Sequence, residues 1–219
     1  MGSTGGVKKF LDYGAKIDRT YSTRIGSRKH GRKHSVVYLH IAIDHGHLEL
    51  VKLLIAHKAN IARVGMDRRR ALHFAKDLDM VRTLLAAGAR EHINALGGSG
   101  GSHPPLDAMV NANVSLEVVR LVLDNGAAPY NPRSFMNPVI AAMMHERADV
   151  VDLLVQYGGK AIKGFRPLSA IGVALHVPDP VLNTKFARLC LLQNPTSFYD
   201  VTVALHSQVG LSWKDSGDS

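Results

Sequence analysis

The sequence predicts an all-α protein in which short helix pairs stack side by side as a solenoid. Three observations predict this class: a recurring spacing, prolines that open segments and glycines that close them. The opening residues of the expected first helices are Leu39, Leu72, Leu106, Val139 and Leu168, and one further step falls on Val201. A period of about 33 residues is typical of proteins that stack one supersecondary unit many times.

The first helix of each pair is expected to begin at a proline and to pack closely on its neighbours. Proline is tolerated at the first helical position, because its missing N–H has no partner within the helix there. The prolines are Pro105, Pro138 and Pro167, and the small residues that let helices approach are Ala42, Ala75, Ala142 and Ala170.

The second helix of each pair is predicted by the segment His47–Ile55, HLELVKLLI, which recurs in similar form from Asp79, Leu116 and Ala148. Its expected core positions are Leu50, Val51, Leu53 and Leu54. Gly88, Gly126 and Gly158 are expected to end these helices in the left-handed conformation. Both helices fall short of the roughly 12–15 residues at which isolated helices become marginally stable. Each pair must therefore bury its apolar face against the next pair.

These residues resemble the ankyrin repeat family, whose unit carries a T-P-L-H-x-A signature. Tyr38–Ile61 is a close match and Ala71–Ala89 a good one, whereas the next two repeats replace the signature histidine with Asp107 and Ile140. The repeat from Pro167 is degenerate. The resemblance implies an ankyrin-type solenoid of stacked antiparallel helix pairs joined by β-hairpin fingers. It also implies that His40 and His73 form hydrogen bonds between neighbouring loops, and that a partner binds on the concave face.

The repeat frame divides the chain into four regions. They are a partial N-terminal repeat (1–18), a basic inserted finger (19–35), about five ankyrin repeats (36–195), and a partial C-terminal repeat with a tail (196–219). Val7–Asp18 has the pattern of a second helix without its first, and the segment from Val201 has the pattern of a first helix without its second. We therefore expect Phe10 and Leu11 to face solvent, and likewise Val203 and Leu205. The chain is then a fragment of a longer solenoid, a truncated product, or a protein with an atypical cap.

The positive charge of the chain is concentrated in two neighbouring fingers. The formal net charge is +9. Residues 19–35 hold six Lys and Arg with no acid, and residues 62–71 hold four Arg against Asp67. We name as the finger set the residues Arg24, Arg28, Lys29, Arg32, Lys33, Arg63, Arg68, Arg69 and Arg70. The three consecutive arginines are expected to be exposed and to contribute little to stability.

Several roles for this basic surface remain open from sequence. Four alternatives are consistent with the sequence. The basic surface is a solvated loop that keeps the protein soluble, or it binds an acidic protein segment. Alternatively it is a split nuclear import signal, or it contacts nucleic acid or anionic lipid. Nucleic acid is the less favoured of these, because no aromatic residues are interleaved to stack bases.

A second candidate surface lies at the ends of the first helices, where the frame predicts exposed residues facing the groove. We name as the helix-end set the residues Asp44, His45, Lys76, Asn111, Asn113, Met144 and His145. Of the adjacent pair Met143 and Met144, one is expected in the core and the other exposed. The alternative is that the set is ordinary polar surface.

Sequence offers no catalytic constellation. His45-Gly46-His47 matches no strong metal spacing, and GGSGGSHPP (97–105) lacks the Gly-Lys-Ser/Thr end of a phosphate loop. Cys190 is expected to be a buried small hydrophobe. We therefore expect a non-catalytic protein-interaction module without metal or cofactor, without a membrane span, in the cytoplasm or nucleus. The alternative is a binder of an anionic ligand through the basic fingers.

Overall fold

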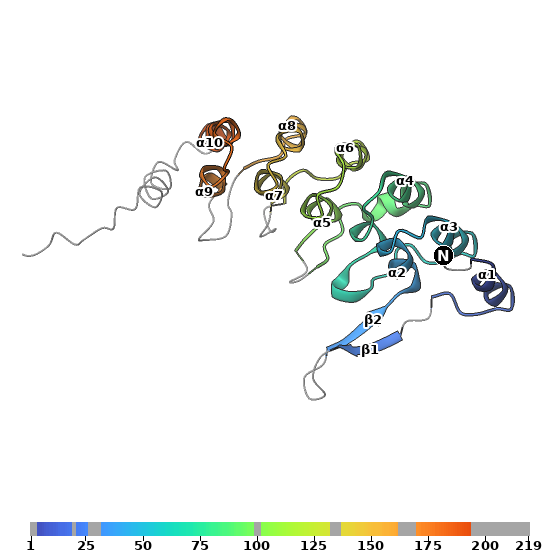
Figure 1. The fold of residues 1–219 in the computed structure, drawn as a ribbon. Coiled ribbons are helices and arrows are strands. Elements are labelled where there is room, and N and C mark those ends of the chain that lie inside the picture. The colour runs from blue at the N-terminus through green and yellow to red at the C-terminus, as the bar shows by residue number, and fades with distance from the viewer. Residues whose placement is uncertain are drawn as a thin grey trace, which may run out of the picture. The chain divides into compact units, whose positions relative to one another are not determined.

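The computed structural model of the chain describes residues 4–18, 21–25, 32–98, 102–131, 137–161 and 170–193. It divides the chain into two compact units, Met1–Ser134 and Phe135–Ser219. Each unit is built from short helix pairs, which confirms the predicted all-α class (Figure 1). No helix within the described residues is both long and apolar enough to cross a membrane.

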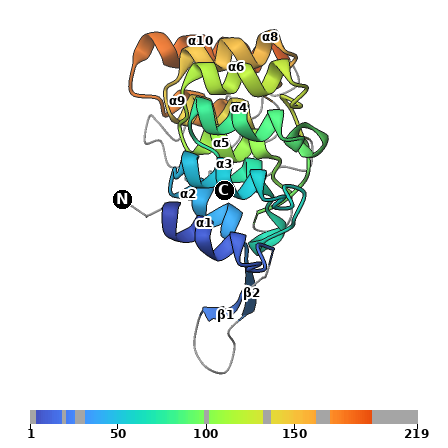
Figure 2. The same cartoon turned by 90° about the vertical axis from the view of Figure 1, so that its right-hand side faces the viewer.

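The first unit stacks its helices in two rows (Figures 1 and 2). The first helices are α2 (Tyr38–Asp44) and α5 (Pro105–Asn111). The second helices are α1 (Thr4–Asp12), α3 (Leu48–Ala56), α4 (Leu78–Ala86) and α6 (Leu116–Asp124). Within a pair α2 packs on α3 and α5 on α6, while between pairs α1 packs on α3, α3 on α4 and α4 on α6. Helices α3, α4 and α6 thus bury apolar residues within this row, as the sequence predicts, whereas α1 buries none.

The repeat around Leu72 lacks a full first helix. A short 3-10 turn, η2 (Ala71–His73), takes its place, and a second 3-10 turn, η3 (Ala89–His92), follows α4. The cause is chain length, because α4 already begins at Leu78, where the Asp77 side chain accepts a hydrogen bond from the Met80 amide at 2.8 Å. In the preceding repeat Leu39 has a longer stretch of chain before α3 begins.

The first finger contains the predicted β-hairpin. Strands β1 (Tyr21–Ile25) and β2 (Arg32–Val36) pair antiparallel, with Tyr21 opposite Val36 and Ile25 opposite Arg32. The hairpin projects away from the helices (Figure 2). In the second finger the described residues form the 3-10 turn η1 (Met66–Arg68) rather than paired strands. The next finger has one isolated bridge, between Gly97 and His103. Within the described residues, paired strands are therefore present in fewer fingers than predicted.

The second helices end in the predicted left-handed conformation. Gly88, Gly126 and Gly158 have φ angles of 99°, 95° and 91°. The equivalent residue after α3 is Lys58, with φ 66°. A side chain in this region is strained, because Cβ approaches the following carbonyl oxygen. The first intact repeat therefore lacks the glycine that its neighbours use.

The described residues of the second unit form two helix pairs, α7 (Pro138–Met144) with α8 (Ala148–Gln156), and α9 (Ala170–Leu175) with α10 (Pro180–Gln193). Helices α7 and α9 also pack on each other. The buried side chains of α10 are Phe186 and Cys190, which confirms the prediction that Cys190 is a core residue. Burial raises the pKa of the Cys190 thiol to about 12. Pro167, Val203 and Leu205 lie outside the described residues.

The core agrees with the predicted pattern except at Leu50 and Leu53. Val51 and Leu54 of α3 are buried, but Leu50 and Leu53 are only half buried. The alanines expected at close helix contacts, Ala42, Ala75, Ala142 and Ala170, are all buried. Pro105 and Pro138 begin α5 and α7 as expected.

Candidate partner-binding surface

The helix-end set lies on the surface, as predicted. Asp44, Asn111 and Met144 are the last residues of α2, α5 and α7, and His45 and His145 follow directly. All seven members are exposed. Met143, by contrast, is completely buried while Met144 is 49% exposed, which confirms the expected division between these two methionines. None of these seven side chains belongs to the core.

An ion pair connects two members of the set across neighbouring repeats. The Lys76 Nζ donates a hydrogen bond to Asp44 Oδ1 at 2.8 Å, with both side chains about half exposed. An exposed ion pair of this kind contributes little to stability. It does hold two charges of opposite sign at a fixed spacing between repeats, where a partner can compete for either one.

His45 and Asn113 are partly engaged by their own backbone environment. The His45 Nδ1 lies 3.0 Å from the Ile41 carbonyl oxygen, and its ring stacks on that of His47 with centroids 6.1 Å apart. Asn113 has φ 53°, a left-handed conformation that asparagine accepts more readily than most residues. Asn113 therefore has a conformational role besides its surface position.

The second finger does not expose all its arginines, contrary to the sequence expectation. Arg68 is exposed, but Arg63, Arg69 and Arg70 are half buried. The Arg70 guanidinium donates a hydrogen bond to the Ala62 carbonyl. The finger folds back on itself, because the Gly65 amide donates a hydrogen bond to the Arg69 carbonyl at 2.8 Å. This turn brings the arginine side chains against the rest of the finger, where they are partly buried.

Arg69 lies between the finger and the helix stack. Its guanidinium carbon lies 5.8 Å from the Phe74 ring centroid, within cation–π range. The Nε atoms of Arg63 and Arg69 are buried and have no hydrogen-bond acceptor among the described residues.

In the strands of the first finger the structure describes the backbone alone. Arg24, Arg32 and Lys33 lie in the hairpin strands, and strand β2 contacts the turn η1 of the second finger. The two basic fingers are therefore neighbours, as the frame predicts. Arg28 and Lys29 lie outside the described residues, as do the side chains of Arg24, Arg32 and Lys33.

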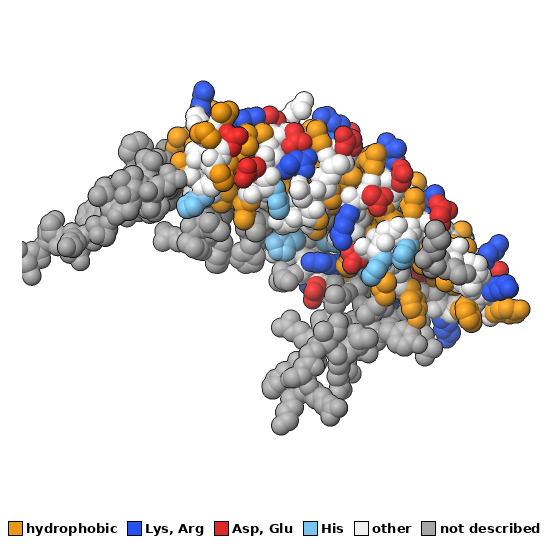
Figure 3. Space-filling model, in the orientation of Figure 1, with side chains coloured by type: hydrophobic (Ala, Val, Ile, Leu, Met, Phe, Trp, Pro, Cys, Tyr) orange, Lys and Arg blue, Asp and Glu red, His pale blue; other side chains and the backbone are white. Residues whose placement is uncertain are grey.

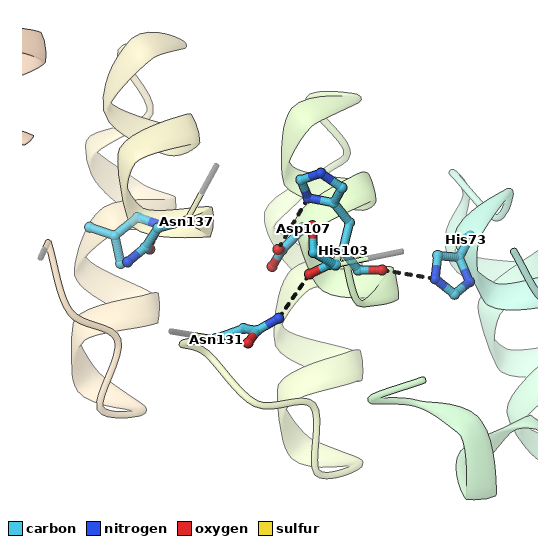
Figure 4. A network of polar contacts seen from close by, with 7 residues as sticks. His73, His103, Asp107, Asn131 and Asn137 are labelled. Carbon is cyan, nitrogen blue, oxygen red and sulfur yellow. Dashed lines mark hydrogen bonds and ion pairs between the residues drawn. The ribbon is translucent and has the colours of Figure 1, made fainter. Parts of the chain in front are cut away.

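A buried polar network, which sequence reasoning only partly anticipated, connects successive loops (Figure 4). The Arg70 amide donates to His73 Nδ1 at 3.1 Å, and His73 Nε2 is 3.1 Å from the His103 carbonyl oxygen. Since Nδ1 accepts, Nε2 carries the proton and donates, so the ring is neutral. Burial lowers the pKa of His73 to about 4, an effect partly offset by these backbone contacts.

His40, the other signature histidine, is also buried. Its ring stacks on Phe74 with centroids 5.0 Å apart, and Gly65 approaches it so closely that any added Cβ would clash with the ring. Burial lowers the pKa of His40 to about 4, with a smaller effect from His73 in the same direction. The expected interloop hydrogen bond is present for His73. For His40, a hydrogen bond with the backbone of Arg63 partly offsets the lowering of the pKa, while Nε2 has no partner among the described residues.

Asp107, which replaces the signature histidine in its repeat, is a residue that the sequence analysis left without a role. Its carboxylate is fully buried, and Oδ2 lies 3.8 Å from His103 Nδ1 (Figure 4). Burial and the charge of Arg69 lower the pKa of His103. The sequence did contain a signal for this contact, because His103 precedes Asp107 by four residues, a spacing that can bring two side chains together near the start of a helix. Asn131 completes the connection by donating to the Ser102 carbonyl at 2.9 Å.

Comparison with known proteins agrees with the helix pairs. Residues 2–95 match a family model described as ankyrin repeats, in three copies. A search of the curated proteins finds no match. The matched region covers α1 and the repeats that contain His40 and His73, and the later helix pairs continue the same frame in the structure.

Proposed function

We propose that this chain, whose residues 2–95 belong to the ankyrin repeat family, binds a partner protein through the helix-end set. Ankyrin repeats are generally protein–protein interaction modules and typically non-catalytic. The observation that carries the proposal is the uniform exposure of the helix-end set beside a core of buried apolar residues. Exposed side chains of this kind contribute little to the core, so we assign their main contribution to recognition.

In the first unit the contact surface has mixed polarity. Asp44, Lys76 and Asn111 offer one acidic, one basic and one amide group, and His45 adds an imidazole. Such a surface selects a partner by complementary polar groups rather than by apolar area. In the second unit the exposed Met144 offers a flexible thioether that adapts to a partner.

The test compares substitutions on two exposed faces of the first unit. The variant Lys76→Glu with Asn111→Asp alters the helix-end set, and the variant Glu49→Lys with Lys52→Glu inverts an exposed ion pair on α3. Tagged wild type and both variants are used to capture proteins from a cell lysate, and their melting temperatures are compared. A partner held by the wild type and the α3 variant, and lost from the helix-end variant, supports the proposal. Identical capture by all three chains contradicts it.

A second candidate function is supported by the half-buried arginines. The exposed Arg68 and the half-buried Arg63 and Arg69 lie in the finger that contacts the basic hairpin, and clustered guanidinium groups suit a carboxylate-rich or phosphate-rich ligand. A labelled acidic peptide and a labelled single-stranded oligonucleotide are the appropriate probes. Binding that weakens steeply with salt and is lost in Arg68→Glu supports this function, since phosphate contacts release counterions. Absence of binding to either probe at low salt excludes it.

A further inference from the structure

Helix α10 of the second unit has apolar residues on two opposite faces. Phe186 and Cys190 lie on one face and are buried. Val181 and Leu192 lie on the opposite face, about three helical turns apart, and are 73% and 78% exposed. A helix with apolar residues all round is normally covered on every side. The second apolar face of α10 therefore lacks a covering element among the described residues.

This exposed face is one wall of an apolar groove between α10 and α8, whose volume is about 840 Å³. The lining residues include Phe186 and Val151, which are almost completely buried, and Leu189 and Val155, which are half buried. Figure 3 shows hydrophobic side chains at the surface over α10. No residue of the helix-end set lines this groove. The groove is therefore a second candidate contact surface, with a largely apolar wall.

The charges beside the groove leave one cation without a partner. Helix α10 contains Lys185 and Arg188 and no acidic residue. Lys185 forms an ion pair across the groove with Asp152 of α8 at 2.6 Å, and Asp149, the other acid of α8, pairs with Arg147. Among the described residues, no carboxylate lies within ion-pair distance of Arg188, which is exposed. The groove thus offers a guanidinium group to a carboxylate of a partner.

The length of the groove determines the size of the occupant. Along α10 the lining residues run from Pro180 to Leu192, which corresponds to roughly 18 Å of helix. A partner helix of about three turns spans this distance. Helices that lie in apolar grooves contact them through residues at i, i+3, i+4 and i+7. The matching occupant is a short amphipathic helix with an acidic residue beside its apolar face.

We propose that the groove between α8 and α10 binds an acidic amphipathic helix of a partner protein. The apolar residues of the partner cover Val181 and Leu192, and its carboxylate pairs with Arg188. A second copy of this chain fits less well, because its formal net charge of +9 opposes association through a positive surface. The groove is formed by second helices, whereas the helix-end set lies at the ends of first helices, so this site is additional to the one proposed above.

The experiment measures the binding of a labelled peptide by fluorescence anisotropy. The probe is a synthetic helix of about 14 residues with leucines at helical spacing and glutamates beside them, and a second probe has lysines in place of the glutamates. Wild type should bind the acidic peptide at least about tenfold more tightly than the basic one. Leu192→Asp and Val181→Asp, which place a carboxylate on the apolar wall, should each weaken binding of the acidic peptide about tenfold or more. Arg188→Glu should reverse the preference between the two peptides.

Two substitutions at comparable exposed residues of the first unit serve as matched controls. Phe10→Glu changes an exposed apolar residue of α1, and Arg120→Glu changes an exposed arginine of α6. Both variants should bind the acidic peptide as the wild type does, and melting temperatures check that every variant is folded.

Three results would overturn the proposal. They are the absence of binding to the acidic peptide, equal binding by wild type, Leu192→Asp and Val181→Asp, and an unchanged peptide preference in Arg188→Glu. Light scattering coupled to size-exclusion chromatography tests the other occupant. A wild type that forms dimers above the 23.8 kDa monomer mass, together with a monomeric Leu192→Asp, would assign the groove to a second copy of the chain instead.

Discussion

The imidazole of His73 donates a hydrogen bond to the backbone carbonyl of His103, which lies in the loop one repeat further on. Its other nitrogen accepts from the Arg70 amide. One neutral side chain thus satisfies backbone groups of two successive loops. Protonation of Nδ1 would break the second bond and place a charge in the core.

Acid should therefore destabilise the first unit. His40 and His73 have folded pKa values of about 4, below the ordinary value of 6.5, so the unfolded chain binds more protons between these two values. The free energy of unfolding should fall as pH decreases from 6.5 towards 4, by about 2 kcal/mol per histidine at pH 5. Urea denaturation followed by circular dichroism at several pH values measures this. His73→Asn should reduce the slope, whereas the exposed His45→Ala should not; equal slopes in all three proteins would contradict the assignment.

The partial burial of Leu53 predicts unequal costs for two neighbouring leucines. Leu54→Ala should lower the free energy of unfolding by about 2–5 kcal/mol, as truncation of a buried leucine does. Leu53→Ala should cost clearly less, because its side chain keeps solvent contact. Denaturant titration of both variants gives the comparison. A larger cost at Leu53 would show that the face of α3 is misassigned.

The left-handed Lys58 predicts a simple stabilising substitution. Lys58→Gly should relieve the strain at φ 66°. After the added flexibility of the unfolded chain is subtracted, a gain of roughly 0.5 kcal/mol remains. Gly158→Ala, at φ 91°, should destabilise the chain by a similar or larger amount. Thermal melting detects both changes, and a drop in melting temperature for Lys58→Gly would contradict the argument.

The arginines of the second finger should separate into structural and surface residues. Arg70→Ala should lower stability by about 1–3 kcal/mol, since it removes a charged donor from the Ala62 carbonyl. Arg68→Ala should change it by less than about 0.5 kcal/mol. Calorimetry on the two single variants tests this directly. If neither substitution changed the free energy of unfolding, the inward position of Arg70 would not contribute to stability, contrary to this prediction.

The fold followed from the sequence wherever one repeat step reproduced the same packing. Pro138 begins α7 and Gly126 ends α6, because these residues impose backbone conformations that neighbours cannot change. The shortening of the first helix to η2 was not anticipated, since it depends on where Asp77 caps the next helix.

The candidate surface was predictable in a similar, partial way. The exposure of Asp44 and Met144 follows from helix periodicity alone. The inward turn of Arg70 does not, because it requires the finger to fold back through the Gly65 hydrogen bond. The role of Asp107 likewise depends on the loop that brings His103 over it. Long-range loop geometry is what the repeat frame leaves undetermined.

Helix α1, which packs on α3 and buries none of its own side chains, should be the first element of its unit to open. Its amide hydrogens should exchange with solvent deuterium faster than those of α4, which has packed neighbours on both sides. The rate of deuterium uptake by α1 then reports on binding at this end of the first unit, because a ligand or protein that contacts α1 would slow the exchange.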